Sequence, residues 1–184
     1  PAQLDIIAHA GERMQDLVAS ILQQTSRTAQ EPFAPVDLRE VVDEAAASYA
    51  PVFSGNRQEL VIAGATSLVI SGDPFRLRQV LDNLLSNAAK YTPAGGRIDV
   101  AIDTAATGQA EVSIIDDGFG MTPEELSRVF EPYFRAERAV RAGISGTGLG
   151  MGIVREIVAA HEGSIDVSSE RGIGTRVILR FPPR

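Results

Sequence analysis

Two asparagines and a lysine on one predicted helix are the first residues that could do chemistry. Asn83, Asn87 and Lys90 follow one another at spacings of four and three residues, which places them on one flank of a helix. A solvated helix face is the ordinary alternative, but asparagine is a poor helix former and its presence beside an apolar stripe needs a reason. Amide oxygens can bind a hard cation such as Mg²⁺, and Lys90 offers a point charge for phosphate.

A second candidate is the segment Asp116–Gly120, in which an acid ends a predicted strand and glycines follow at alternate positions. A carboxylate there can accept a hydrogen bond from an exocyclic amine such as N6 of adenine. The glycines let the backbone pass close to a flat ring. The alternatives are a plain turn with a capping aspartate or a Ca²⁺ loop, and the acid spacing of an EF-hand is absent.

The third candidate is the glycine-rich segment Gly143–Gly152, which leads directly into a predicted helix. Free N–H groups and the helix dipole make such a helix start a phosphate site. A dinucleotide-binding fingerprint has a different glycine spacing and requires a parallel βαβ unit. A Walker P-loop is excluded because it needs Gly-Lys-Ser/Thr, and Lys90 is the only lysine of the chain.

The composition is that of a soluble globular domain. The chain has 184 residues, of which 44% are hydrophobic and 22% are charged. Its formal net charge is -7, and without a cluster of basic residues a nucleic-acid partner is not expected. The absence of cysteine excludes disulfides and thiolate metal sites. No apolar run approaches the roughly 18 to 20 residues of a membrane span.

Residues 1–31 are predicted to form one long helix before the domain that carries the candidate residues. Two apolar series repeat every seven residues and interleave as a coiled-coil or bundle seam: Leu4, Gly11 and Val18, and Ile7, Met14 and Ile21. An amphipathic helix packed on its own domain is the alternative. Two prolines in Glu31–Pro35 form a semi-rigid linker or edge strand, so we place the domain boundary here and expect a second domain over residues 32–184.

The second domain alternates predicted helices and strands. Apolar spacing and capping residues predict helices from Asp37 to near Pro51, from Asp73 to near Tyr91, at 122–129 and at 149–161. Alternating residues predict strands at 59–63, 67–71, around 98–102, around 112–114, at 164–168 and at 175–181. Residues 132–146 show no clean period and are expected to form a mobile lid. The sum is a two-layer α/β sandwich: a mixed, mostly antiparallel sheet with helices on one face.

The order of these segments resembles the histidine kinase branch of the ATPase superfamily that also contains gyrase, Hsp90 and MutL. The matching segments cover the family's N-box, its G1 box, its F-box, its G2 box and the glycine turn before its last strand: Gln79–Pro93, Asp116–Gly120, Phe130–Arg135, Gly146–Gly152 and Gly172–Thr175. The match extends over residues 33–181 and implies a Bergerat-type ATP-binding fold.

This resemblance implies a role for each candidate residue toward ATP and Mg²⁺. Asn87 is expected to bind the metal with Asn83 beside it, and Asp116 to bond the adenine amine directly and through water. The other expected cofactor-binding residues shape the adenine pocket or meet the phosphates and the lid: Lys90, Tyr91, Gly118, Gly120, Met121, Arg135, Gly146, Thr147, Gly148, Leu149, Gly150 and Thr175. Asn83, Asn87 and Lys90 are the expected catalytic set.

The resemblance also implies an enzyme, a histidine protein kinase of two-component signalling. Residues 1–31 then look like part of the second helix of the dimerisation and phosphotransfer hairpin, through which the full-length protein forms a homodimer. The partner that receives the phosphate is a response regulator receiver domain. The domain is expected to work in the cytoplasm, and a membrane-anchored parent stays open.

One departure from the family pattern limits what the chain is expected to do alone. The family's phosphoacceptor histidine lies on a preceding helix, and His9 stands in a sequence that does not match its setting. The chain is therefore expected to bind ATP but not to autophosphorylate. Two other functions remain as alternatives: a non-catalytic nucleotide-sensing dimerisation module and a serine-directed kinase of the same superfamily. His161, at a predicted helix end where a cation would suit the dipole, is expected to be structural.

Overall fold

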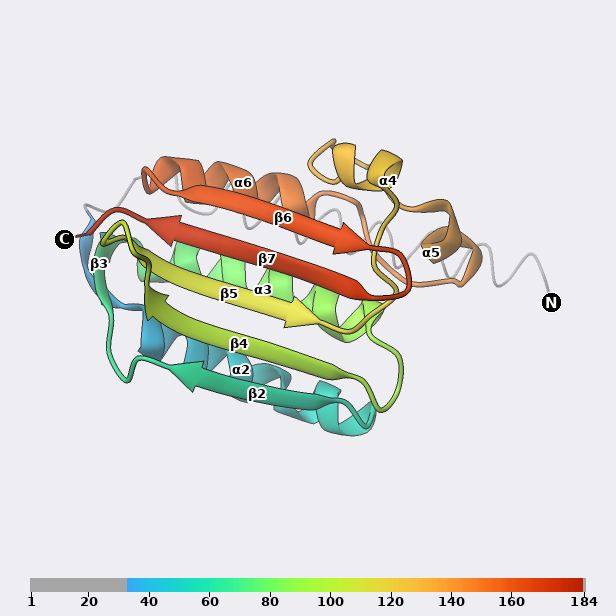
Figure 1. Cartoon of the computed structure of the whole chain (residues 1–184), viewed down its shortest axis with the longest axis horizontal. Coiled ribbons are helices and arrows are strands. Elements are labelled where there is room, and N and C mark those ends of the chain that lie inside the picture. Colours follow the sequence, from blue (N-terminus) through green and yellow to red (C-terminus); the bar gives the residue numbers. More distant parts are fainter. Residues whose placement is uncertain (1–32, 184) are drawn as a thin grey trace.

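The computed structural model of the chain describes residues 33–183, in which three helices lie against one face of a five-stranded sheet (Figure 1). These helices are α2 (Leu38–Gly55), α3 (Pro74–Tyr91) and α6 (Gly150–Ala160). Helix α3 is the central one and contacts both α2 and α6. This two-layer α/β sandwich confirms the predicted fold class.

The strand order of the main sheet brings together segments that are far apart in the chain. The order is β2 (Glu59–Gly64), β4 (Arg97–Thr104), β5 (Ala110–Asp116), β7 (Gly174–Phe181) and β6 (Ser164–Glu170). Strands β2 and β4 are parallel, and the other neighbours are antiparallel. The sheet is therefore mixed and mostly antiparallel, as predicted. Pro35 of the linker lies within β1 (Ala34–Asp37), which pairs antiparallel with β3 (Val69–Gly72).

The hydrophobic core fixes how α3 is rotated about its axis. Alternate residues of β4 and the apolar stripe of α3 are buried between the layers: Ile98, Val100, Ile102, Leu77, Val80, Leu81, Leu84 and Leu85. Side chains with a helical period of 3.6 cannot all face the sheet. The flank that carries Asn83 and Asn87 is consequently half-buried, at the edge of the core.

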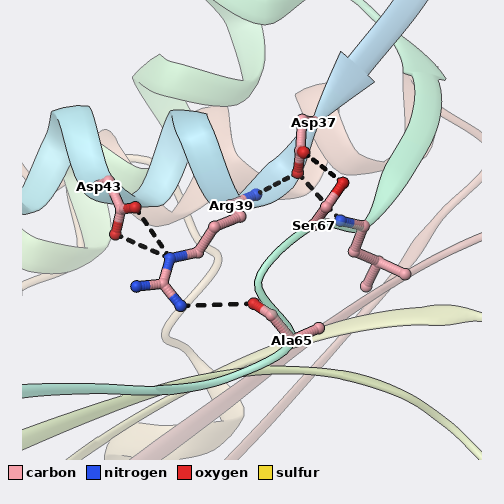
Figure 2. A network of polar contacts seen from close by, with 6 residues as sticks. Asp37, Arg39, Asp43, Ala65 and Ser67 are labelled. Carbon is pink, nitrogen blue, oxygen red and sulfur yellow. Dashed lines mark hydrogen bonds and ion pairs between the residues drawn. The ribbon is translucent and has the colours of Figure 1, made fainter.

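Asp37 anchors the beginning of α2 to the loop that precedes β3 (Figure 2). Its carboxylate accepts hydrogen bonds from the Arg39 N–H at 2.9 Å, the Leu68 N–H at 3.0 Å and the Ser67 hydroxyl at 2.5 Å. Desolvation acts to raise the pKa of this carboxyl, but these hydrogen bonds together lower it. Arg39 extends the network to Asp43, one turn further along the helix. The end of β1 and the beginning of α2 are thus held on the chain that leads through β3 into α3.

One local prediction was wrong, and one short helix was not predicted. Pro51 lies inside α2 and does not end it. Proline removes the N–H that would bond the carbonyl four residues earlier, and that residue, Ala47, is exposed, so water can satisfy its carbonyl. In the predicted lid, residues Glu137–Arg141 form a short helix, α5. The other predicted helices and strands agree with the structure within a few residues, including the short helix α4 (Pro123–Ser127).

His161 is structural, but it does not act as the cation that its helix-end position suggested. Its Nε2 accepts the N–H of Asp73 at 3.0 Å, and its Nδ1 lies 2.8 Å from the carbonyl of Ile157. An acceptor at one nitrogen and a donor at the other define the neutral tautomer. The ring is buried and stacks on Phe33, with 4.5 Å between the ring centroids. His161 therefore joins the end of α6 to the beginning of α3.

The expected helix at residues 1–31, with His9, and the domain boundary at residue 32 lie outside the described residues. Within residues 33–183, none of the helices has both the length and the apolar character needed to cross a bilayer.

Candidate functional site

A cavity of about 420 Å³ lies between α3, the ends of β5 and β7, the lid segment and the start of α6. Most of the residues singled out from the sequence line it: Asn83, Asn87, Lys90, Tyr91, Asp116, Gly120, Met121, Arg135, Gly146, Thr147, Gly148, Gly150 and Thr175. Gly118 and Leu149 were also predicted but stand just outside the lining. Asn87 and Asp116, which come from different elements, thus face one shared space.

Helix α3 positions the side-chain amides of Asn83 and Asn87, and its start is fixed by a capping aspartate. At its start, Asp73 accepts the N–H groups of Phe75 at 2.9 Å and Arg76 at 3.2 Å, and Pro74 occupies the first turn. Along its flank, the side-chain N–H of Asn83 donates to the carbonyl of Gln79 at 2.9 Å. The amide oxygen of Asn83 lies near Gly150, where α6 begins. The side chain of Asn83 therefore stands at the junction of two segments that wall the cavity.

Asp116 is a partly buried carboxylate at the end of β5. Its Oδ1 accepts the N–H of Gly118 at 2.9 Å, and Thr175 is its neighbour in β7. Burial raises the pKa of Asp116 to about 6, against the opposing effect of hydrogen bonds from the backbone of Gly118 and Thr175. At neutral pH the group is an ionised acceptor with little hydration, which suits it to receive a hydrogen bond from a ligand amine.

The segment after Asp116 is held on both sides by backbone contacts. The N–H of Phe119 donates to the carbonyl of Tyr91 at 3.0 Å, and the carbonyl of Phe119 accepts the N–H of Gly172 at 2.8 Å. Gly118, which precedes Phe119, supports Asp116 through its N–H without lining the cavity. The Tyr91 side chain does line it, and burial raises the pKa of its phenol despite the opposing effect of Arg135.

The lid and the beginning of α6 bring donors for an anion to the cavity. Arg135 lines it and donates one N–H to the carbonyl of Ile144, while its buried Nε has no hydrogen-bond partner. Helix α6 begins at Gly150 after Leu149, whose side chain makes no cap. The first N–H groups of a helix without a side-chain cap are open to an anionic ligand.

The apolar walls of the cavity and one arginine beside it, Arg138, were not among the predicted residues. Ile114 and Val177 line the cavity, and each lies two positions from a predicted residue on the same strand. That alternation is a signal from which they could have been found. Arg138 of α5 donates to the carbonyl of Gly120, and its guanidinium carbon lies 5.3 Å from the Phe119 ring centroid. No period in the lid sequence points to it.

The donor set fits a magnesium nucleotide better than a metal held by protein alone. Groups of three or more His, Cys, Asp or Glu side chains that could hold a metal are absent from residues 33–183. Mg²⁺ commonly takes one or two protein ligands and completes its shell with water and phosphate oxygens. The apolar walls suit a flat ring, Asp116 suits an amine, and the lid with the start of α6 suits phosphates.

Comparisons with known proteins agree with this arrangement. Residues 72–184 match the family described as histidine kinase-, DNA gyrase B- and HSP90-like ATPases. The sensor histidine kinase RcsC of Escherichia coli K12 is 34% identical over 147 residues, which are 78% of this chain and 15% of RcsC. ZraS of Klebsiella oxytoca, another sensor histidine kinase, is 33% identical over 96% of this chain and 37% of its own length.

The chain is also similar in structure to solved proteins. The mycobacterial sensor histidine kinase MprB superposes with a TM-score of 0.72 at 32% identity, over 83% of this chain and 98% of that one. Full-length ShkA gives a TM-score of 0.78 at 27% identity, over 98% of this chain and 38% of that one. The chain thus spans a minor part of the full-length relatives. It belongs to the histidine kinase-, DNA gyrase B- and HSP90-like ATPase family and, within that family, is similar to the catalytic domains of sensor histidine kinases.

Proposed function

We propose that this domain binds Mg²⁺·ATP in the described cavity and transfers the γ-phosphate to a histidine on a helix outside residues 33–183. The observation that carries the proposal is the shared cavity of Asn87 and Asp116, with the uncapped start of α6 at its edge. The similar protein ShkA was solved in complex with AMPPNP, an ATP analogue, which supports a nucleotide as the ligand.

Each wall of the cavity has a separate task in the proposed complex. Asp116 accepts the adenine amine, and Ile114 and Val177 give the ring an apolar surface. Asn87 offers an amide oxygen to Mg²⁺, with Asn83 beside it. Lys90, Arg135 and the N–H groups of the Gly146–Gly150 segment face the phosphates.

The chemistry asks the protein for position and charge more than for covalent steps. The bond between the γ-phosphorus and the β,γ-bridging oxygen breaks, a bond from phosphorus to an imidazole nitrogen forms, and ADP leaves. Mg²⁺ supplies charge neutralisation of the triphosphate when it is bound. Lys90 and Arg135 also neutralise the negative charge of the triphosphate, from the protein side, and the lid excludes water.

Position 83 distinguishes this function from ATP hydrolysis. Hydrolytic members of the superfamily place a glutamate one turn before the metal-binding asparagine to activate water, and here that residue is Asn83. An amide is not a base at any ordinary pH, so water attack is not promoted. The same residue disfavours the serine-directed kinase, and the complete set of cavity residues disfavours a sensor that has lost its chemistry.

The full-length protein is proposed to work as a homodimer through the helix that contains residues 1–31. It would pass the phosphate to a response regulator receiver domain. Because its substrates are ATP and that regulator, we place the domain in the cytoplasm.

The nucleotide assignment is tested by Asp116→Asn. The variant keeps an acceptor for the Gly118 N–H but loses the ionised acceptor for the amine, so affinity for a fluorescent ATP analogue should fall at least tenfold, or about 1.4 kcal/mol. Titration of the folded variant with Mg²⁺ present measures this. Asp103→Asn, on an exposed part of β4, is the control with the same change of charge. Equal affinity of the Asp116 variant and the wild type rejects the adenine assignment.

The transfer itself is tested by mixing the chain with a separately produced phosphoacceptor hairpin of its own parent and γ-labelled ATP. Label is expected on the hairpin, in an acid-labile bond typical of phosphohistidine, and none on the chain alone. Binding of ATP without transfer to the hairpin would support the sensor module. Release of labelled inorganic phosphate as the main product would support a hydrolase.

A further inference from the structure

Gln58 is a buried amide outside the nucleotide cavity, and both hydrogen bonds that its side chain donates go to one end of α3. It precedes β2, and its side chain is 8% exposed. Its Nε2 donates to the carbonyl of Ala89 at 3.0 Å and to that of Thr92 at 2.6 Å. Its Oε1 accepts the side-chain N–H of Asn56 at 3.3 Å. Both side-chain N–H groups of Gln58 therefore donate to carbonyls at the C-terminal end of α3.

The last turn of α3 needs an outside donor because of the residue that follows it. In a continuing helix the carbonyl of Ala89 would accept the N–H of residue 93, but residue 93 is proline and has no N–H. Thr92 is already extended, with φ -91° and ψ 128°, as is usual before proline. The side chain of Gln58 thus replaces the missing backbone donor.

The backbone on either side of Gln58 grips the same turn. The N–H of Gly95 donates to the carbonyl of Arg57 at 3.0 Å, and the N–H of Glu59 donates to the carbonyl of Gly96 at 2.9 Å. The N–H of Gln58 itself donates to Phe53 at the end of α2, at 2.8 Å. The turn after α3 is consequently tied to α2 and β2 by a short segment centred on Gln58.

What this turn carries is one wall of the cavity. Lys90 and Tyr91 line the cavity from it, and the carbonyl of Tyr91 accepts the N–H of Phe119 at 3.0 Å. Phe119 belongs to the segment that supports Asp116. A displacement of the last turn of α3 would therefore shift Lys90, Tyr91 and the support of Asp116 together.

We propose that Gln58 is a positioning residue of the nucleotide site, which acts by holding the last turn of α3 against the segment that follows Asp116. This inference rests on the proposed nucleotide-binding function. Gln58 itself does not line the cavity. Its effect on nucleotide reaches the site through Ala89, Thr92 and the backbone bond between Tyr91 and Phe119.

The test uses Gln58→Met in the 184-residue chain, because methionine keeps the length of the side chain and removes both donors. Affinity for a fluorescent ATP analogue with Mg²⁺ is expected to fall five- to thirtyfold. Native-state exchange of the Phe119 amide hydrogen should become at least tenfold faster. Gln58→Asn keeps the donors at a shorter reach, so an intermediate loss is expected, and this milder variant answers the question if the methionine variant does not fold.

The control for a general loss of stability is Ile102→Val, which removes one methyl group from a fully buried residue of β4. This variant should melt at a lower temperature, yet keep its affinity within twofold and its Phe119 exchange unchanged. Gln58 variants that lose stability but bind nucleotide normally and protect Phe119 normally would overturn the inference. If the wild type bound no nucleotide, the proposed function would fail, while exchange of Phe119 in the nucleotide-free chain would still decide the role of Gln58.

Discussion

At the scale of single residues, Asp116 shows a conflict between binding and stability. Its pKa, raised from 3.8 to about 6 chiefly by burial, means that the folded state favours the protonated carboxyl. The stabilising contribution of the protonated form is present below the unfolded pKa and is lost as pH rises through about 6. At neutral pH the folded protein therefore carries an ionised group that lowers its stability.

Removal of this charge should make the protein more stable. Asp116→Asn is expected to raise the free energy of unfolding at pH 8 by roughly 1–3 kcal/mol, because the amide needs less hydration than the carboxylate and still accepts the Gly118 N–H. Urea denaturation of both proteins without nucleotide measures the difference. It should shrink as pH falls from 6 toward 4, since the wild-type carboxyl becomes protonated.

The control again is Asp103→Asn, which changes the net charge equally at an exposed place. A gain of the same size in that variant would mean that net charge, and not burial, is the cause. A loss of stability in the Asp116 variant at pH 8 would contradict the raised pKa.

The residues that could be predicted from the sequence are those whose own type is unusual in its setting. Asn87 interrupts a helix of good formers, and Asp116 ends a strand that glycines follow at alternate positions, so both could be predicted from the sequence. Gln58 and Arg138 could not, because glutamine before a strand and arginine in a loop are ordinary. Their importance comes from the carbonyls that they meet, on Ala89 and Gly120, which are remote in the chain.

At the scale of elements, the segment after Asp116 packs backbone against backbone on the turn between β6 and β7. Gly120 has φ 57°, and a Cβ there would overlap the carbonyl of Glu170. The Phe119 carbonyl accepts the N–H of Gly172 in the same turn. Two segments of backbone meet here with no side chain between them. Their close packing therefore depends on the absence of a Cβ at Gly120.

Gly120→Ala is therefore expected to cost more than its backbone conformation alone explains. Gly108, in the turn between β4 and β5, has a similar positive φ of 80° but open space around it, so Gly108→Ala should cost about 1–2 kcal/mol. Gly120→Ala should cost at least twice as much and lower the affinity for ATP analogues, while Gly108→Ala leaves that affinity unchanged. Urea denaturation and nucleotide titration give the two numbers. Equal costs would show that the close approach is easily relieved.

Most elements were predictable because local signals determine them. Asp73 with Pro74, the alternation in β4 and β5, and the apolar stripe of α3 are all short-range features. The exceptions were tertiary in origin. Pro51 stays within α2 because the carbonyl that loses its helical donor belongs to Ala47, which is exposed to solvent. Helix α5 forms in a segment without a clear period. The neutral state of His161 depends on the N–H of Asp73, which lies 88 residues away along the chain.

At the scale of the whole molecule, the cavity is assembled from segments between residues 83 and 177 that sheet order brings together. Periodicity predicts strands but not their neighbours, so the parallel pairing of β2 with β4 and the position of β7 beside β5 could not be read from spacing. Only the resemblance to a known family predicted that the segments around the cavity come together. The lid is a lightly packed part of this assembly, since Ala139 is the one buried residue of α5.

Arg138 is one link between this lightly packed lid and the rest of the domain. It binds the Gly120 carbonyl and lies over the Phe119 ring, both on the segment that supports Asp116. Arg138→Met keeps a long apolar side chain but removes the charged hydrogen bond, so a fluorescent ATP analogue should dissociate about three to ten times faster in stopped-flow displacement. A charge-assisted hydrogen bond contributes on the order of 1–3 kcal/mol, enough for a change of that size.

The matched control for the lid is Arg141→Met, on the same short helix. Within residues 33–183, Arg141 pairs only with Glu137 one turn away, where both side chains are about three-quarters exposed, at 75% and 77%, and exposed pairs contribute little. The two variants change the charge of α5 equally, so a purely electrostatic effect on the triphosphate would speed dissociation in both. Faster dissociation in the Arg138 variant alone would mean that the lid is held through its contact with Gly120 and Phe119. Equal rates in both variants would contradict that role and leave only the charge of the lid.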